Sequence, residues 1–203
     1  MGESSVEIPQ DIIDSVIAAV GNDASLLKKC ALVSSSFLLP SRKQLFSRFT
    51  LKSDQTCQRI HQILVQNPII QSFVRSISFN DVEYENFEWI HGSTSLLAIL
   101  RLPFPCLECF SIRLGNVWGY DPWNDLWNDL YIQSTRNWDS FSSELKEVLS
   151  NIVHLPTLKT LTLKGIPKVP ITSFLHSSRM STLQHWSCIP ARRTILVMKT
   201  QAR

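Results

Sequence analysis

The sequence predicts an α+β protein in which a three-helix module precedes a region of alternating strands and helices. Three observations predict this fold. Short amphipathic segments follow one another between residues 8 and 49, an apolar spacing typical of half-buried strands recurs between residues 74 and 163, and helical periodicity lies between its copies. We therefore divide the chain into three parts: a helical module at 1–50, a repeat region at 51–189 and a basic tail at 190–203.

The first helix is expected to begin at Pro9, because a proline in the first turn sacrifices no intrahelical hydrogen bond. Gly21 is expected to end it. Between these two residues the apolar side chains follow the rhythm that forms one wide stripe along a helix. They are Ile12, Ile13, Val16, Ile17 and Val20.

Two more short helices are expected before residue 50. Asn22, Asp23 or Ser25 can cap the second, and a hydroxyl of the serine run at 34–36 can cap the third, with Pro40 in its first turn. Three helices this short, each with a wide apolar stripe, cannot enclose a core by themselves. We expect a partner to cover part of their apolar surface.

The spacing of these residues resembles a known family. The pattern Ile8-Pro9-x-Asp11-Ile12-Ile13-x-x-Val16-Ile17 is followed by Leu27-x-x-Cys30-x-x-Val33-Ser34-x-x-Phe37 and by Arg42-x-x-Leu45-Phe46. Together they resemble the F-box, in particular F-box-like modules of the fungal, basidiomycete type. That family usually has Leu-Pro at the start, Glu for Asp11 and often Trp for Phe37. The three departures keep size and polarity.

The resemblance implies a partner and a set of contacts. An F-box module binds a Skp-type adaptor, and through it the cullin of a ubiquitin ligase, so the protein would recruit an unknown protein substrate. The alternative is a repeat scaffold unrelated to ubiquitin, in which the N-terminal helices cap the repeats. By the family pattern much of the adaptor contact would come from Ile8, Pro9, Ile12, Ile13, Val16 and Ile17. Four further residues would complete this contact or support it from the module's own core: Leu32, Val33, Phe37 and Leu45.

A six-residue pattern recurs downstream, with apolar residues at its first, fourth and sixth positions. Copies begin at Val74, Leu107 and Leu158, and a weaker fourth copy begins at Leu183. This spacing resembles leucine-rich repeats, in which each unit contributes a strand to a curved parallel sheet and a helix or loop to its outer side. The uneven intervals indicate a short, irregular α/β solenoid with insertions. Helices are expected at 54–66, 93–102 and 140–154.

Two segments of this region do not follow the repeat. The insertion at 115–138 contains Trp118, Trp123, Trp127 and Trp138, and an exposed tryptophan cluster would be a partner surface. The alternative is that these residues cap the repeat core. The tail at 190–203 holds four basic residues and no acid, and we interpret it as a poorly ordered end or the product of an imperfect gene model that cuts the array short.

Composition limits the classes of function. The 203 residues are 44% hydrophobic and 18% charged, with a formal net charge of +3, which is typical of a globular chain and gives no indication of nucleic-acid binding. No apolar stretch approaches the length needed to span a bilayer. The five cysteines are scattered and odd in number, which favours a reducing, intracellular compartment, either cytoplasm or nucleus.

The sequence contains no recognisable catalytic or metal-binding constellation. Cys106 and Cys109 have the spacing of half a zinc site, but no second pair stands at ligand distance. The chain lacks a glycine-rich phosphate loop and a paired His motif. We therefore expect no catalytic residues, no metal and no cofactor, and the leading hypothesis is a binding module that works by bringing two proteins together.

Overall fold

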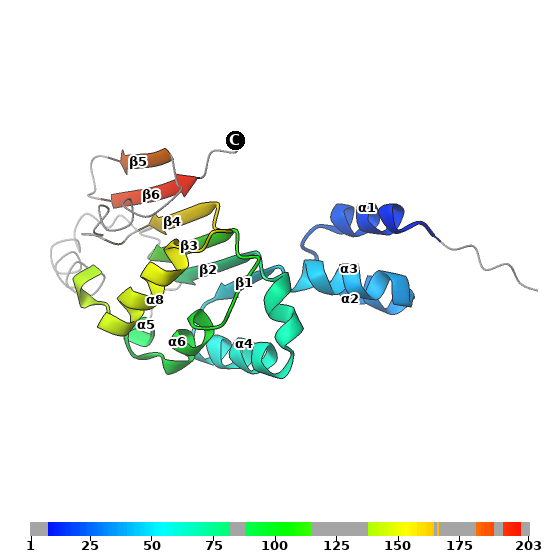
Figure 1. The fold of residues 1–203 in the computed structure, drawn as a ribbon, viewed down its shortest axis with the longest axis horizontal. Coiled ribbons are helices and arrows are strands. Elements are labelled where there is room, and N and C mark those ends of the chain that lie inside the picture. The colour runs from blue at the N-terminus through cyan, green and yellow to red at the C-terminus, as the bar shows by residue number, and fades with distance from the viewer. Residues whose placement is uncertain are drawn as a thin grey trace, which may run out of the picture. The chain divides into compact units, whose positions relative to one another are not determined.

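A computed structural model describes residues 8–81, 88–114, 138–164, 166, 182–188 and 193–199. The chain divides into two compact units, Met1–Arg48 and Phe49–Arg203, so the boundary lies close to the residue 50 that the sequence pattern suggested. The first unit is helical, and the second is built on a sheet with helices (Figure 1). The chain is thus a mixed helix-and-strand protein of the α+β class.

The first unit consists of three helices: α1 (Gln10–Val20), α2 (Ala24–Val33) and α3 (Ser35–Leu45). Of the three candidate caps of α2, Asp23 takes the role, and its Oδ1 accepts hydrogen bonds from the backbone N–H groups of Ser25 at 2.9 Å and Leu26 at 3.0 Å. Two donors that lack an intrahelical acceptor are satisfied in this way.

The third helix differs from its expected form, because Pro40 lies inside α3 and not in its first turn. Ser34 serves both as the C-cap of α2 and as the N-cap of α3, so the helix begins at Ser35 and reaches Pro40 in its second turn. Proline has no amide hydrogen, so the carbonyl of Ser36 loses its usual donor four residues later. This helix tolerates one missing backbone hydrogen bond.

A small core holds the three helices together. Ile13, Ile17 and Leu27 are almost fully buried. Val20, Cys30, Phe37 and Leu45 pack against them and are partly buried. One polar contact adds to this packing: the Gln44 side-chain amide donates to the carbonyl of Gly21 over 3.0 Å. Gly21 has φ 66, a left-handed conformation that glycine adopts without steric cost, and it ends α1 as expected.

The second unit contains one six-stranded sheet in the order β1-β2-β3-β4-β6-β5. Strand β2 pairs with β3, and β3 with β4, in parallel, whereas β6 is antiparallel to β4 and to β5. The arrows of β1 to β4 point the same way in Figure 1. The strands are β1 (Arg48–Leu51), β2 (Ser76–Asp81), β3 (Cys109–Leu114), β4 (Thr160–Lys164), β5 (Thr182–Cys188) and β6 (Arg193–Lys199).

The three strong copies of the apolar pattern lie side by side and in step. Ser76 pairs with Cys109, and Cys109 pairs with Thr160, so equal positions of the copies stand next to each other. Their first, fourth and sixth residues are all at most 4% exposed. The core of the sheet therefore follows from the repeated spacing, through Val74, Leu107 and Leu158, then Ile77, Phe110 and Leu161, then Phe79, Ile112 and Leu163.

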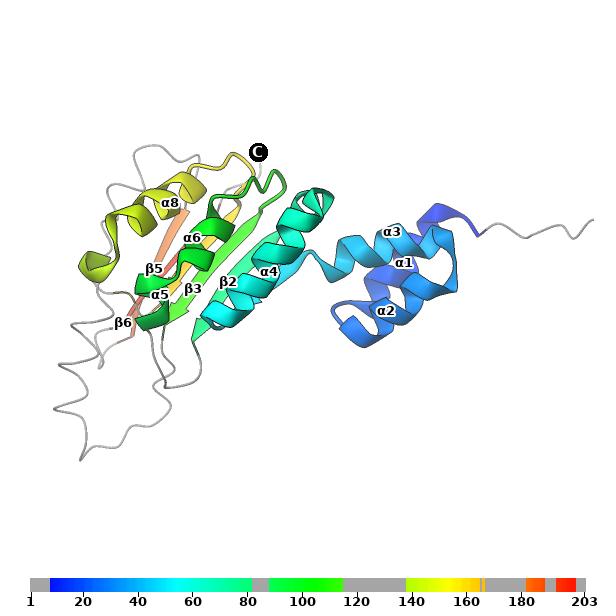
Figure 2. The ribbon, with the colours of Figure 1, turned by 90° about the horizontal axis from the view of Figure 1, so that it is seen from below.

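Helices α4, α6 and α8 lie on one face of this sheet (Figure 2), with α6 packed against the other two. Each begins with a serine cap whose hydroxyl accepts from a backbone N–H two or three residues into the helix: Ser53, Ser93 and Ser142. Ser93 also donates to the Asp54 carboxylate in the first turn of α4. The helical segments are α4 (Asp54–Gln66), η1 (Pro68–Phe73), α5 (Glu88–Gly92), α6 (Thr94–Leu100), η2 (Trp138–Ser140) and α8 (Ser143–Val153).

The C-terminal part of the sheet differs from expectation in two ways. The expected fourth copy at Leu183 does form a strand, β5, but it pairs with β6 and does not extend the parallel array beside β4. Within the expected disordered tail, Arg193–Lys199 forms β6, which pairs antiparallel with β4. Pairing satisfies the backbone groups that β4 would otherwise leave open at a sheet edge, so the array ends in a hairpin. No helix in the described part of the chain is long and apolar enough to cross a membrane.

Candidate interaction surfaces

The three-helix unit exposes an unusual amount of aliphatic surface for its size. Leu32 is 86% exposed, Val33 69% and Ile12 50%, and Ile8 and Val16 are exposed to a similar degree as Ile12. We call Ile8, Ile12, Val16, Leu32 and Val33 the exposed aliphatic set. Single apolar side chains are common on protein surfaces, whereas several on one small unit indicate an interaction site.

The two sides of α1 explain which predicted contacts are available. Ile12 and Val16 stand four residues apart and share one side of the helix. Ile13 and Ile17 share the neighbouring side, about 100° around the axis, and they are 1% and 4% exposed. The wide stripe of the sequence is therefore two stripes, one for the core and one for solvent. This corrects the prediction that Ile13 and Ile17 contact the adaptor: in this structure they lie in the unit's own core.

The remaining predicted contacts divide in the same way. Pro9 is exposed, next to Ile8. Phe37 and Leu45 are partly buried against the core, a position that fits the supporting role, one of the two roles open to them. Sequence reasoning missed Leu26 and Leu39, which are 43% and 49% exposed. Leu26 could have been found, because it stands seven residues before Val33 and so shares a side of α2 with it.

A second surface lies on the sheet, on the side opposite the helices. Because side chains alternate along a strand, the residues between the buried apolar positions of β2, β3 and β4 face away from the core. We call this side the hydroxyl face, since serine and threonine dominate it. It lines an open hollow of about 310 Å³, together with Phe79 and Phe110 of the core. Its residues are Thr50, Ser76, Ser78, Cys109, Ser111, Arg113, Thr160 and Thr162.

The polar groups of the hydroxyl face are unequally satisfied. The Ser78 hydroxyl donates to the Thr50 hydroxyl over 3.2 Å. By contrast, the Ser111 Oγ is buried and has no hydrogen-bond partner in the part of the chain that the structure describes. Arg113, two residues further along β3, is exposed and forms no ion pair with any residue that the structure describes. The face thus presents an unused hydroxyl and an unpaired guanidinium close together.

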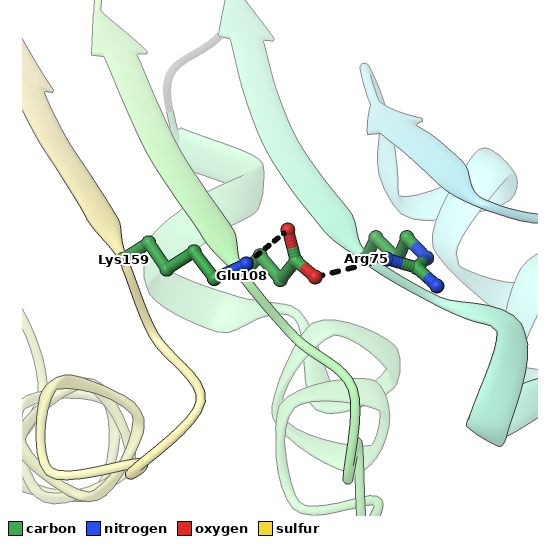
Figure 3. A network of polar contacts seen from close by, with 3 residues as sticks. All are labelled: Arg75, Glu108 and Lys159. Carbon is green, nitrogen blue, oxygen red and sulfur yellow. Dashed lines mark hydrogen bonds and ion pairs between the residues drawn. The ribbon is translucent and has the colours of Figure 1, made fainter. Parts of the chain in front are cut away.

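A row of ion pairs crosses the sheet where the parallel strands begin (Figure 3). Glu108 accepts from Arg75 at 2.9 Å and pairs with Lys159 at 3.1 Å. The three residues occupy the second position of the three repeat copies. Arg75 and Lys159 are well exposed, so each pair contributes only about 0–1 kcal/mol to stability. With two cations for one acid, the row adds positive charge to this edge of the sheet.

Trp138, the last residue of the predicted insertion, is not available for the partner surface predicted there. Trp138 is 7% exposed and packs against Phe141, with ring centroids 5.6 Å apart. This overturns its assignment to a partner surface, because a buried indole already uses its apolar area in the core. The other predicted members, Trp118, Trp123 and Trp127, lie outside the described residues.

Four cysteines are free thiols: Cys30, Cys57, Cys106 and Cys109. Cys57 of α4 is fully buried. Burial, and secondarily the Asp54 carboxylate, raises the pKa of its thiol from 9.0 to about 12. A thiol that keeps its proton is a poor nucleophile and a poor metal ligand. Cys106 and Cys109 are half-buried, and within the described ranges no three His, Cys, Asp or Glu side chains are grouped so as to hold a metal ion.

Comparison with known proteins gives no relative. No protein-family model, no curated protein and no solved structure matches this chain. The exposed aliphatic set and the hydroxyl face therefore have to be interpreted from their own residues and geometry.

Proposed function

We propose that the protein is a substrate-recruiting subunit of an SCF-type cullin-RING ubiquitin ligase. The three-helix unit acts as an F-box-like module that binds a Skp-type adaptor, and through it the cullin. The sheet unit acts as an irregular leucine-rich-repeat-like solenoid that captures a target protein. Such a subunit works by proximity, because tethering raises the concentration of the target near the conjugating enzyme.

The exposed aliphatic set is the observation that supports this proposal most strongly. It belongs to a unit in which only Ile13, Ile17 and Leu27 are almost fully buried apolar residues. Full burial of an aliphatic side chain contributes about 1.5–3 kcal/mol, and the side chains of the set keep roughly half or more of their surface exposed. Covering several of them would offset the entropy cost of association and give a stable complex.

The sheet unit supports the second half of the proposal. Three repeat copies lie in register, and the helices occupy one face of the sheet (Figure 2). The hydroxyl face on the other side presents a hollow lined by small polar side chains. Small side chains let the backbone or side chains of a partner approach the strands closely. A target could thus bind to the sheet while the three-helix unit binds the adaptor.

The proposal is tested by measuring the affinity of the full chain for a purified Skp-type adaptor. Ile12→Asp should weaken binding at least 30-fold, because a carboxylate would be buried without a partner in an apolar interface. Ile12 is 50% exposed in the free protein, so the substitution should leave the fold intact. Val65→Asp is the matched control, since Val65 is 52% exposed on helix α4 of the other unit, and its adaptor affinity should stay within twofold of wild type.

Circular dichroism of both variants separates loss of docking from loss of structure. Ile13→Asp serves as the unfolding reference, because it places a charge in the core of the three-helix unit. The ligase proposal fails if the wild-type chain does not bind the adaptor at micromolar concentration. It also fails if Ile12→Asp binds the adaptor as tightly as Val65→Asp does. A repeat scaffold unrelated to ubiquitin would then be the better explanation.

A further inference from the structure

The hydroxyl face carries more chemical information than its shape alone. Its hollow reaches from Thr50 of β1 to Thr160 and Thr162 of β4. Strands lie about 4.8 Å apart, so four neighbouring strands span about 14 Å. An extended peptide of about four residues covers that distance. The hollow therefore has the length of a short linear segment.

The hydrogen-bond donors of this face that have no acceptor among the described residues indicate which chemical group a bound segment should offer. Hydroxyls both donate and accept, so most of the lining residues do not select a charge. The Ser111 hydroxyl oxygen is buried without a hydrogen-bond partner among the described residues, and a buried polar group of this kind is costly unless a ligand or water completes it. The nearby Arg113 offers donors only. Both side chains can therefore donate to an acceptor on a ligand.

The charge of the face determines whether that acceptor should be neutral or an anion. Among the described residues that line the hollow, Arg113 is the only charged one. In the sheet register it stands between Asn80 of β2 and Lys164 of β4, so this rung contains no acid. The ion-pair row where the strands begin has two cations, Arg75 and Lys159, for the single acid Glu108. The described groups around the hollow thus favour an anion and disfavour a basic segment.

We propose that the hydroxyl face binds a short, extended acidic segment of the target protein and that an Asp or Glu carboxylate of this segment binds between Ser111 and Arg113. One carboxylate oxygen accepts from the Ser111 hydroxyl, and the guanidinium of Arg113 donates to the carboxylate. One guanidinium matches the single charge of a carboxylate, and Arg113 is the one charged side chain in the described lining of the hollow. This inference rests on the part of the proposed function that assigns target capture to the sheet unit.

The test uses the full chain and a fluorescein-labelled hexapeptide of alternating Glu and Ser, followed by fluorescence anisotropy. Matched peptides replace every Glu with Gln, or every Ser with phosphoserine and every Glu with Gln. The Glu peptide should bind at least 10-fold more tightly than the Gln peptide, and its affinity should fall as salt is raised from 50 to 300 mM, as expected for ionic contacts at a surface. The phosphoserine peptide should bind no more tightly than the Glu peptide.

Two variants assign the binding to the proposed residues. Arg113→Gln should weaken the Glu peptide about 10-fold and Ser111→Ala about fivefold, as expected for one charge-assisted and one neutral hydrogen bond. Arg101→Gln is the matched control, because Arg101 has the same charge but pairs with Glu144 beside α6 and α8, at 3.7 Å. Its peptide affinity should stay within twofold of wild type.

Several results would overturn the inference: no binding of the Glu peptide at 1 mM, equal binding of the Glu and Gln peptides, equal effects of Arg113→Gln and Arg101→Gln, or 10-fold tighter binding of the phosphoserine peptide. Adaptor affinity measured on the same preparations keeps the two proposals separate. Arg113→Gln should bind the adaptor normally, and Ile12→Asp should bind the peptide normally. Peptide binding without adaptor binding would refute the ligase role alone.

Discussion

The two units of this chain differ in whether most of their large apolar side chains are buried or exposed. Among the described residues, Met1–Arg48 has three buried large hydrophobic side chains and seven exposed ones, whereas Phe49–Arg203 has 26 buried hydrophobic side chains and three exposed ones. The sheet unit has a complete core of its own. The helical unit has a core of minimal size and leaves seven large aliphatic side chains exposed.

This contrast has a physical origin in how the apolar residues are spaced. In the sheet unit each copy of the repeat directs its apolar residues to one side, where helices cover them, and adjacent copies extend the same core. In the helical unit the apolar residues run around more than one side of each short helix, and three helices can cover only one side of one another. The sheet unit therefore buries its apolar residues by internal packing, whereas the helical unit leaves several of its own exposed.

The largest expected effect is on the sheet core. Phe110 is 1% exposed in the central parallel strand, and its ring packs edge to face on Phe79 with centroids 5.5 Å apart. Phe110→Ala should lower the free energy of unfolding of the sheet unit by about 3–5 kcal/mol and its melting temperature by roughly 10 °C. Thermal unfolding followed by circular dichroism measures this. Val65→Ala, an exposed-site control, should change the melting temperature by no more than about 2 °C.

The second prediction separates the two stripes of α1. Ile13→Ala should destabilise the helical unit by about 2–4 kcal/mol, because it leaves a cavity in a core of minimal size. Ile12→Ala should change its stability by no more than about 0.5 kcal/mol, since Ile12 is half exposed, but should reduce adaptor affinity. Amide hydrogen exchange of α1 reports the first effect. Equal exchange rates in the two variants would contradict the division into a core stripe and a solvent stripe.

The smallest expected effect concerns one cysteine in each unit. Cys57 of the sheet unit is fully buried and Cys30 of the helical unit is half-buried. Iodoacetamide should therefore alkylate Cys30 of the native protein well before Cys57, because reaction needs an accessible thiolate. Mass spectrometry of tryptic peptides measures both rates. Equal rates would show that the sheet unit opens as readily as the helical one.

The raised pKa of the Cys57 thiol predicts that the stability of the protein depends on pH. The pKa of this thiol is raised from 9.0 to about 12 by burial and then by Asp54. Above pH 9 the unfolded chain loses this proton while the folded chain keeps it, so the Cys57 contribution to stability is full below pH 9 and is lost as pH rises from 9 to 12. Urea unfolding at pH 8 and pH 10.5 should show a smaller loss for Cys57→Ala than for wild type.

The repeat register could be predicted from the sequence because it depends on local spacing. Val74, Leu107 and Leu158 mark the same position in three copies, and the parallel sheet keeps these positions in step. The sequence also favours Asp54 as the cap of helix α4 and Asn67-Pro68 as its stop. The helix ends at Gln66 as expected, but its cap is Ser53. Patterns of this kind involve residues that are close together in the sequence, so they can be recognised without knowledge of distant contacts.

Other features depend on contacts that no local pattern contains. The sequence shows Ile12 and Ile13 as equivalent members of one stripe, and only the position of α2 and α3 decides that Ile13 is buried. Arg193–Lys199 lacks the repeat pattern, and its role as a strand depends on the open edge of β4. The hydroxyl face is visible only when three distant copies are aligned, since Ser78, Ser111 and Thr162 are far apart in the chain.

The position of β6 has a consequence for how the protein is made. It is the last strand in the sequence, yet it lies between β4 and β5. During synthesis, β1 to β4 can pair in the order in which they leave the ribosome, but β5 has to wait for β6 before it can join the sheet. A message that ends before codon 193 would lack β6, and β5 would then have no strand to pair with in the sheet. The edge of β4 would then be open to pairing with other copies of the chain, and the nascent protein would become prone to aggregation.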